Sequence, residues 1–479
     1  MGQIWAVARN LVVEVLRMRA LMVFIILLFG ISTFGFGYWL HLGSSSADEK
    51  LQTFLSYSLS ITAHFLSLMT IFISIATITR DIKHKQLFTV ATKPVSRGGY
   101  LAGKLLGMAL LNLILLSAAG GTIYGLTLLG ARIEPAKDID PDLSRAKLEH
   151  LILVARKAVH PSIVGMTQQQ IETQAQIEAE KRLTEFVNQN YIKDPVVIEK
   201  KRKQLIEEWI KRISLLHRSV LPGKYIVWLF EGIKPVDQEN GLVFIRYKHE
   251  VSPNPDNTDL ATTGTWAYGG TENVLFAGNQ FQTRDVIRTP HEFGLPNEAV
   301  SEEGNLYLAY ENHLTNSPVI VIYPLPGKKD PFMFTKEIGI EALFVAGGFT
   351  GNFLKGMAAI YLRLLFLSML GIALAAWLSF PVAVLTALVI FMIGLCSYFI
   401  LSSIRFEYGS KWVSFGNIAM TFLPQLAAYD PVPEMEKGRL VSNQMLGSCF
   451  LMLILIKGGI ISFVGYLIFR FRELARVIV

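Results

Sequence analysis

Cysteine is nearly absent from this chain. Cys396 and Cys449 are its two cysteines, and both lie inside long apolar runs. A disulfide framework is therefore excluded, and any part of the protein outside a cell needs a hydrophobic core of its own. Charge is scarce too, because 17% of the 479 residues are Asp, Glu, Lys or Arg, against about 25% in soluble domains. This composition excludes an ordinary soluble enzyme.

Motifs of several catalytic classes are also missing. The chain has no G-x-S-x-G nucleophile elbow. The segment from Gly98 to Lys104 nearly fits a phosphate-binding loop, but Leu105 replaces the required Ser or Thr. The histidines between 131 and 350 lack zinc-site spacing; they are His150, His160, His217, His249, His291 and His313. We therefore expect no catalytic residue, no metal site and no cofactor in this chain.

Apolar residues make up 51% of the chain and gather towards its two ends. About 20 consecutive apolar residues are needed to cross a membrane. Stretches of this kind run over 20–40, 51–79, 105–130, 356–378, 382–404 and 446–469. The sequence therefore predicts an α-helical membrane protein with six transmembrane helices, grouped as 20–130 and 351–479.

The charges at the ends of these stretches predict the orientation. One side carries twelve cations against three acids, whereas the short loops of the other side, 43–50 and 405–445, carry five cations and six acids. Because cations favour the cytoplasmic side, we expect both termini in the cytoplasm and 131–350 outside. We expect a multi-pass protein of a cell membrane, namely a bacterial inner membrane. The net charge of +7 comes from the cytoplasmic loops and requires no nucleic acid.

Two further segments are predicted to lie at the membrane surface. In 1–19, apolar residues recur at helical spacing with Arg9 and Arg17 off that face. This pattern indicates an interfacial amphipathic helix, although the segment could instead extend the first span. In 405–445, Gly416 and Pro424 interrupt an apolar stretch. We expect this segment to lie at the outer interface or to enter the membrane and return.

The insert 131–350 changes character along its length. Residues 142–219 are charged and helical in pattern, with a capping box at Thr167 and Gln170 and Asp194 before Pro195 as a second helix start. Residues 223–345 contain short β-rich runs separated by turn residues. The insert is therefore predicted to be α+β, a helical hairpin followed by a jelly-roll-like β-sandwich; a small barrel is the alternative.

Aromatic residues in the β-rich part are candidate ligand-binding groups. They are Trp228, Trp266, Tyr268, Tyr307 and Tyr310. If exposed, such rings could stack on sugars. Aromatics at alternating strand positions are otherwise core residues, and the sequence leaves both interpretations open.

Three ionisable residues lie inside predicted spans: His64, Arg363 and Lys457. No span contains Asp or Glu to pair with the two cations. An unpaired cation at mid-membrane costs at least about 2.5–3.5 kcal/mol. We interpret the three as a polar translocation path for a lipid-linked or anionic substrate. The alternative is that the cations extend to the interface.

The loop 80–104 is strongly basic. An Arg–acid pair leaves one span, a Lys-Pro-Val-Ser-Arg sequence follows, and Gly-Lys opens the next span; Leu423-Pro424-Gln425-Leu426 and Tyr429-Asp430 follow later in the chain. In this order the segments resemble the coupling loop and outer segment of type-2 ATP-binding-cassette export permeases. The similar subgroup includes the permease of the nitrous-oxide-reductase maturation transporter. One departure is Lys85-Gln86-Leu87, where that family often has Gly-Thr.

The resemblance implies a permease subunit without an ATPase of its own. ATP and Mg²⁺ would be bound by a separate ATPase subunit, and a second permease, identical or different, would complete the transporter. A short surface helix over 81–91, ended by Pro94, would dock on the ATPase. The residues assigned to this coupling are Arg80, Asp81, Lys83, Lys85, Lys93, Pro94, Val95, Ser96 and Arg97.

Two alternatives remain open at this point. The loop could be an ordinary basic loop held by anionic lipid headgroups. The protein could instead be a membrane-anchored binding, signalling or mechanotransmission protein whose insert recognises a ligand outside the membrane.

Overall fold

The chain forms two compact units, one from 1–155 with 347–479 and one from 156–346. The structure, a computed structural model, describes residues 2–18, 22, 26, 30, 46–83, 96–133, 148–161, 168–190, 194–234, 241–251, 261–271, 279–314, 318–321, 340–407 and 423–471. Each unit is described by itself.

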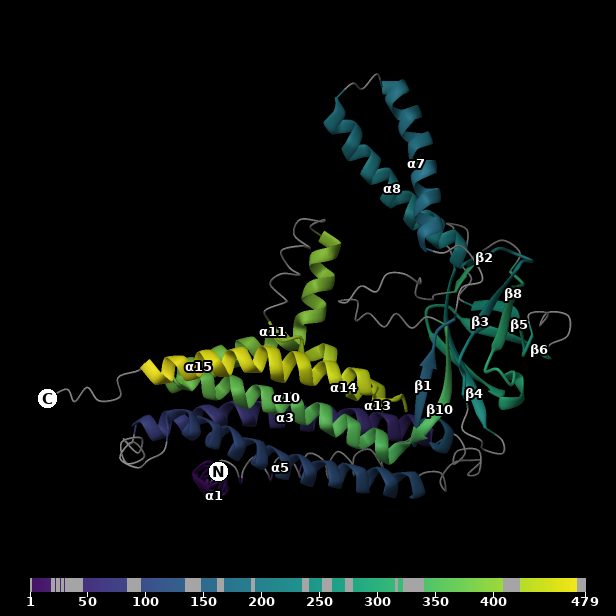
Figure 1. The fold of residues 1–479 in the computed structure, drawn as a ribbon. Coiled ribbons are helices and arrows are strands. Elements are labelled where there is room, and N and C mark those ends of the chain that lie inside the picture. Colours follow the sequence, from purple (N-terminus) through teal and green to yellow (C-terminus); the bar gives the residue numbers. More distant parts are fainter. Residues whose placement is uncertain are drawn as a thin grey trace. The chain divides into compact units, whose positions relative to one another are not determined.

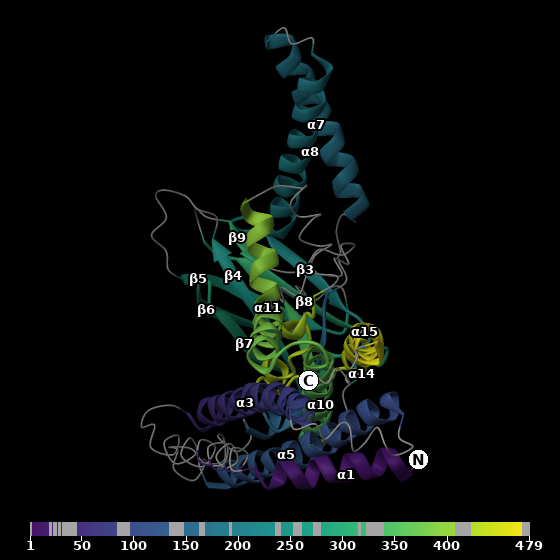
Figure 2. The ribbon, with the colours of Figure 1, turned by 90° about the vertical axis from the view of Figure 1, so that its left-hand side faces the viewer.

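The first unit is helical (Figures 1 and 2). Its elements are α1 (Gly2–Leu16), α3 (Ala47–Lys83), α5 (Arg97–Ile133), α10 (Phe349–Ala375), α11 (Phe380–Glu407), η3 (Leu426–Tyr429), α13 (Val432–Met435), α14 (Asn443–Cys449), η4 (Phe450–Gly458) and α15 (Gly459–Phe471). Among the described residues, five helices are long and apolar enough to cross a membrane: α3, α5, α10, the first part of α11, and 443–471. The protein is therefore membrane-embedded. The predicted span 20–40 lies largely outside the described residues.

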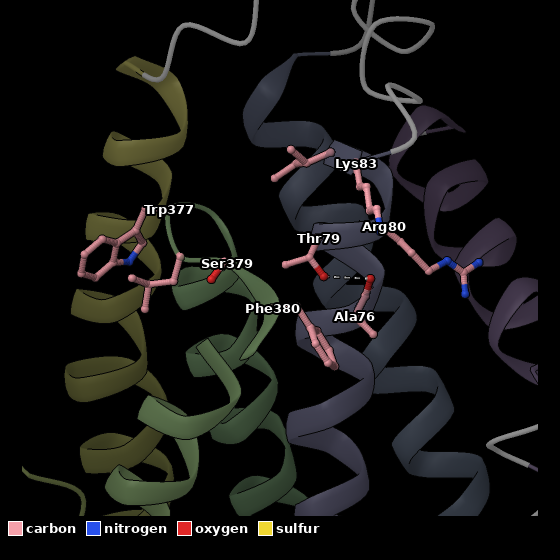
Figure 3. A pocket seen from close by; sticks show the side chains of 9 residues that line it. Ala76, Thr79, Arg80, Lys83, Trp377, Ser379 and Phe380 are labelled. Atoms are coloured by element: carbon pink, nitrogen blue, oxygen red, sulfur yellow. Dashed lines mark hydrogen bonds between the residues drawn. The ribbon is translucent and has the colours of Figure 1, made fainter. Parts of the chain in front are cut away.

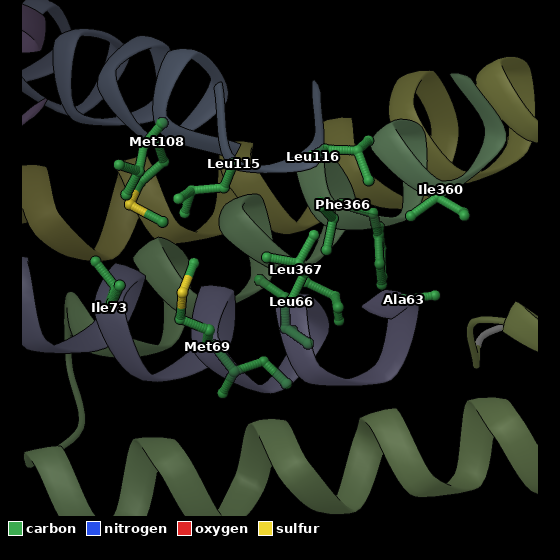
Figure 4. Close-up of a cluster of buried hydrophobic side chains, with 14 of the residues drawn as sticks. Ala63, Leu66, Met69, Ile73, Met108, Leu115, Leu116, Ile360, Phe366 and Leu367 are labelled. Atoms are coloured by element: carbon green, nitrogen blue, oxygen red, sulfur yellow. The ribbon is translucent and has the colours of Figure 1, made fainter. Parts of the chain in front are cut away.

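The core of this unit lies between α3, α5 and α10. Figure 4 shows Leu66, Met69, Met108, Phe366 and Leu367 meeting there. All of these side chains are at most 1% exposed. Because lipid is as apolar as leucine, close packing rather than burial from water holds such helices together. α10 is the helix through which the others are joined, since it packs on α3, α5, α11 and α15.

α1 is a separate helix that packs on α5. Its buried residues are Ala8, Leu11 and Val15, and the helix ends at Leu16. A Cβ atom added to Gly107 of α5 would lie 2.9 Å from the carbonyl oxygen of Ala8. The glycine therefore permits the two backbones to approach each other.

The last span contains a π-helix. η4 forms nine residues of π-helix between α14 and α15. Cys449, Leu453 and Gly465 are among the buried residues of this span. Its other side carries exposed apolar residues such as Leu455 and Phe463.

The second unit contains a helical hairpin. It is formed by α7 (Gln168–Asn190) and α8 (Pro195–Arg218). The Asp194 carboxylate accepts a hydrogen bond of 2.9 Å from the Val196 N–H, which confirms the predicted cap at the start of α8. Ala175 of α7 and Ile213 of α8 form a buried cluster, against which Trp209 and Ile210 pack.

Two antiparallel sheets complete this unit. Their strands are β1 (Val154–Val159), β2 (Ser219–Val220), β3 (Tyr225–Phe230), β4 (Leu242–Val251), β5 (Ala261–Gly269), β6 (Asn279–Val286), β7 (Pro290–Pro296), β8 (Leu306–Asn312), β9 (Val319–Val321) and β10 (Glu341–Gly348), with the short helix η2 (Asn297–Ala299) after β7. One sheet has the order β1-β10-β4-β9-β2, with β7 on β4, and the other β3-β8-β5-β6. Both contribute side chains to one core, for example Ile245 of β4 and Leu308 of β8.

One prediction for this region is wrong. Residues 142–219 were predicted to be helical, but Val154–Val159 form strand β1. Its charged Arg156 is 4% exposed and pairs with Glu292 at 2.5 Å. Glu292 is more exposed than Arg156, and its carboxylate compensates the buried charge of Arg156 within the sheet.

Candidate functional site

The two helices that flank the predicted coupling loop are joined by a buried ion pair. Asp81 lies in the last turn of α3 and Lys104 in the third turn of α5. The Lys104 ammonium lies 2.7 Å from the Asp81 Oδ2 atom, and the residues are 3% and 6% exposed. The Tyr100 hydroxyl donates a hydrogen bond to the same carboxylate oxygen. The loop therefore begins and ends at one fixed point of the helix bundle.

Neighbouring residues connect this point to two more helices. Arg80 forms an ion pair of 2.5 Å with Glu14 of α1. Arg97 of α5 donates a hydrogen bond of 2.6 Å to the Arg470 carbonyl at the end of α15, where carbonyl groups lack helical partners. The ring of Tyr100 also stacks on Phe469 at 6.1 Å. We call Glu14, Arg80, Asp81, Arg97, Tyr100 and Lys104 the loop-anchor cluster.

Asp81 and the first residues of the predicted surface helix lie at the end of α3. Asp81 was assigned to ATPase coupling, and the structure places it in a buried ion pair with Lys104 rather than on the surface. Asp81 to Lys83 continue α3, and the rest of the helix predicted over 81–91 lies outside the described residues. Burial of the charged pair requires both groups to stay together, since separating them would leave an uncompensated charge.

Of the other predicted coupling residues, the structure describes Lys83 and Ser96. Ser96 caps α5, because its hydroxyl accepts a hydrogen bond of 3.0 Å from the Gly99 N–H, and Lys83 is exposed at the end of α3. The remaining ones lie outside the described residues: Lys85, Lys93, Pro94 and Val95.

A groove lies beside the loop-anchor cluster. It has a volume of about 720 Å³. Figure 3 shows Thr79, Arg80 and Lys83 of α3 on one side and Trp377, Ser379 and Phe380 on the other. The Arg80 side chain points away from Trp377, towards its partner on α1. The groove is lined mainly by apolar atoms and has its cations at one edge.

A polar contact in the middle of the bundle joins three spans. The Thr70 hydroxyl donates to the Asn112 Oδ1 atom at 2.9 Å. The Asn112 amide in turn donates to the Ser368 hydroxyl at 3.2 Å. All three side chains are fully buried. Hydrogen bonds of this kind fix the register of neighbouring transmembrane helices. Asn112 was not singled out from the sequence, although a lone Asn in an apolar run was the available signal.

The two cations predicted to lie unpaired inside spans have partners from outside the spans. Arg363 of α10 lies 3.5 Å from the Asp430 carboxylate, and the Lys457 ammonium donates to the Leu423 carbonyl. The expectation that Arg363 has no acidic partner is therefore wrong. Both cations hold the segment 423–442, and Asn352 adds a hydrogen bond of 2.7 Å from the Val441 N–H.

His64 lies apart from these cations. Its Nδ1 atom lies 2.7 Å from the Ser60 carbonyl on the same helix, and its ring meets the edge of Phe391 at 6.4 Å. Each of the three residues predicted to form a translocation path, His64, Arg363 and Lys457, therefore contacts a different partner.

The candidate aromatics of the second unit do not form one exposed platform. Trp228, Trp266 and Tyr310 are at most 2% exposed and belong to the sandwich core, which confirms the core interpretation for these three and excludes them as exposed stacking groups. Tyr268 is partly buried against that core. Tyr307 packs with Ala267 and Ala309 in a separate small cluster.

The same core contains a buried histidine. His249 is fully buried, and its Nδ1 atom lies 2.9 Å from the Thr262 hydroxyl. Burial, with a smaller effect of the neighbouring His291, lowers the pKa of His249 to about 3. The Asp285 carboxylate accepts a hydrogen bond of 3.0 Å from Tyr247, and burial followed by this carboxylate raises the pKa of Tyr247 above its usual range. Among the described residues, no group of three or more His, Cys, Asp and Glu residues could hold a metal ion.

Comparison with known proteins gave no match to a family model, to a curated protein or to a solved structure.

Proposed function

We propose that this chain is the membrane-spanning permease subunit of an ATP-binding-cassette exporter. The observation that carries the proposal is the buried Asp81–Lys104 pair at the base of the basic loop. Because the pair joins α3 to α5, a displacement of the loop would move both helices together. The adjoining contacts of Arg80 and Arg97 would pass the displacement on to α1 and α15. A separate ATPase, with its own ATP and Mg²⁺, supplies the displacement.

The proposal includes a topology. We infer six spans, with 20–40 as the first, both termini in the cytoplasm and the second unit outside. The charge bias of twelve cations against three acids supports this orientation. We also infer a jelly-roll-like sandwich, which is supported by two sheets that share one core, a six-stranded one in which β4 pairs with β7, β9 and β10 and a four-stranded one with the order β3-β8-β5-β6.

The partners follow from the same arrangement. An ATPase docks on exposed cations of the loop, among them Lys83 at the end of α3, and a second permease completes the transporter. The loop carries Lys85 and Lys93 as well, so an acidic surface on the ATPase is the complementary partner.

The test is retention of an ATPase by the tagged chain. The wild type, purified in mild detergent after cross-linking in its own membranes, should retain a protein with a phosphate-binding loop. Reversing two cations, Lys83→Glu with Lys85→Glu, should weaken that retention. The matched control, Lys200→Glu with Lys224→Glu, makes the same charge change at exposed positions of the second unit and should leave it unchanged. If the wild type retains no ATPase, the exporter proposal is wrong.

A second candidate function is transmission of a signal or force to a partner outside the membrane. The α7–α8 hairpin favours it, because Val196 and Val197 are 75% and 44% exposed at its tip. Replacing both by Asp should abolish binding of such a partner and leave an ATPase complex intact. Unchanged partner binding would count against this candidate.

A further inference from the structure

The groove beside the loop-anchor cluster lies where the apolar parts of two spans end. On one side, α3 carries no charged residue from Leu51 to Thr79 and then continues through Arg80, Asp81 and Lys83. On the other side, α10 ends at Ala375 and α11 begins at Phe380. In a membrane-embedded protein, residues at this level meet the lipid headgroups.

The side chains of the groove suit that level. Trp377 is 51% exposed at its rim, and tryptophan is enriched at the boundary between hydrocarbon and water because its ring is apolar and its N–H is polar. Phe380 and the carbon atoms of Thr79 provide apolar surface below it. An occupant therefore needs an apolar part and a polar end.

The charged and polar side chains of the groove determine which polar end an occupant can have. Arg80 is engaged by Glu14, whereas Lys83 has no carboxylate partner in the described part of the chain. Across the groove, the Ser379 hydroxyl is a further hydrogen-bond donor (Figure 3). A cation and a hydroxyl on opposite walls are complementary to a phosphate group, and basic pockets between spans bind anionic headgroups.

We propose that this groove is a binding site for an anionic phospholipid. The headgroup phosphate binds Lys83 and Ser379, and the glycerol and first acyl carbons lie against Trp377 and Phe380. The lipid thereby connects the end of α3 to the turn between α10 and α11. The proposal goes beyond the exporter function and does not depend on it, because it requires only that the helices lie in a membrane.

Native mass spectrometry of the full chain in detergent, without any ATPase, tests the site. Phosphatidylglycerol, phosphatidylcholine and inorganic phosphate are the probes. Phosphatidylglycerol should be retained in preference to phosphatidylcholine. Lys83→Gln should weaken it about fivefold, the contribution of one lysine near a membrane surface. Lys355→Gln also removes one positive charge, but near the start of α10, the end of that helix that lies away from the groove, and it should not change lipid retention.

Trp377→Leu provides a second variant that leaves all charges in place. It should also weaken retention, and circular dichroism melting identifies any variant that has lost its fold. Equal retention of the two lipids, an equal effect of Lys83→Gln and Lys355→Gln, or unaltered binding by Trp377→Leu would overturn the proposal. Displacement of phosphatidylglycerol by inorganic phosphate at millimolar concentration would show a site for free phosphate instead.

Discussion

Removing one partner of the Asp81–Lys104 pair should destabilise the helix bundle strongly. The two charged atoms lie 2.7 Å apart, and the side chains are 9% and 4% exposed. Their attraction is roughly 6 kcal/mol at an effective dielectric constant near 20, but much of it is offset by the cost of burying both charges. Loss of one partner leaves the other charge buried and uncompensated, which costs about 3–5 kcal/mol. We expect a loss of this size for Lys104→Met.

The double variant separates this explanation from a simple loss of packing. In Asp81→Asn with Lys104→Met, neither buried charge remains, and the introduced side-chain amide can still accept the hydrogen bond of Tyr100. The double variant should therefore be more stable than either single variant. The coupling free energy, from a double-mutant cycle, should be about 3 kcal/mol. Reversible unfolding in mixed micelles measures all four proteins, and Lys355→Met serves as the control.

Two results would refute the reasoning. The first is a Lys104→Met variant no less stable than Lys355→Met. The second is a double variant that loses the sum of the two single losses. Either would mean that the two charges are solvated in the folded protein, and that the loop is not fixed to the bundle at this point.

Three further predictions concern other parts of the chain. Gly107→Leu should lower the free energy of unfolding by about 1–3 kcal/mol, because the larger side chain would overpack against the backbone of α1, and it should expose α1 to protease. Gly121→Leu should be tolerated, because a Cβ atom at that position meets nothing within 4 Å. Because burial lowers the pKa of His249 to about 3, the unfolded chain binds a proton below about pH 6.5 that the folded chain does not. The free energy of unfolding of the second unit should therefore fall by about 2 kcal/mol as the pH is lowered from about 7 to about 5. Faster hydrogen exchange of β4 and β5, after correction for intrinsic rates, measures this loss. Unchanged protection of these strands would contradict the prediction. With the native cysteines replaced, an impermeant thiol reagent should label Glu302→Cys on intact cells and Lys83→Cys only after lysis. The opposite pattern would invert the proposed topology.

The parts of the structure that follow from composition along the chain were predictable from the sequence. Apolar runs of about 20 residues identified five helices that the structure describes, because crossing a membrane requires that length. The start of α8 was equally local, since Asp194 and Pro195 are adjacent in the sequence and act on the same helix turn.

The candidate site depended on contacts that no local pattern contains. Asp81 was the only acid in a basic loop, and such an acid is usually solvated; its burial depends on Lys104 of the next helix. Arg363 likewise looked unpaired because Asp430 lies outside the spans. Alternation along β5 and β8 places Trp266 and Tyr310 on one face, but which face is buried is decided by the second sheet.

The π-helix of the last span has a consequence for the direction in which residues face. At about 100° per residue in an α-helix, Gly465 would lie roughly 160° around the axis from Cys449, although both are buried. A π-helix turns less per residue, because each of its hydrogen bonds spans one more residue than in an α-helix. Its nine residues rotate α15 back, so that Gly465 meets Ala373 of α10. A helical wheel that uses the α-helical period throughout 443–471 would therefore assign the wrong residues to the lipid-facing side of the helix. Cysteine accessibility along this span should instead keep the α-helical period before 450 and after 458, with a phase shift between them.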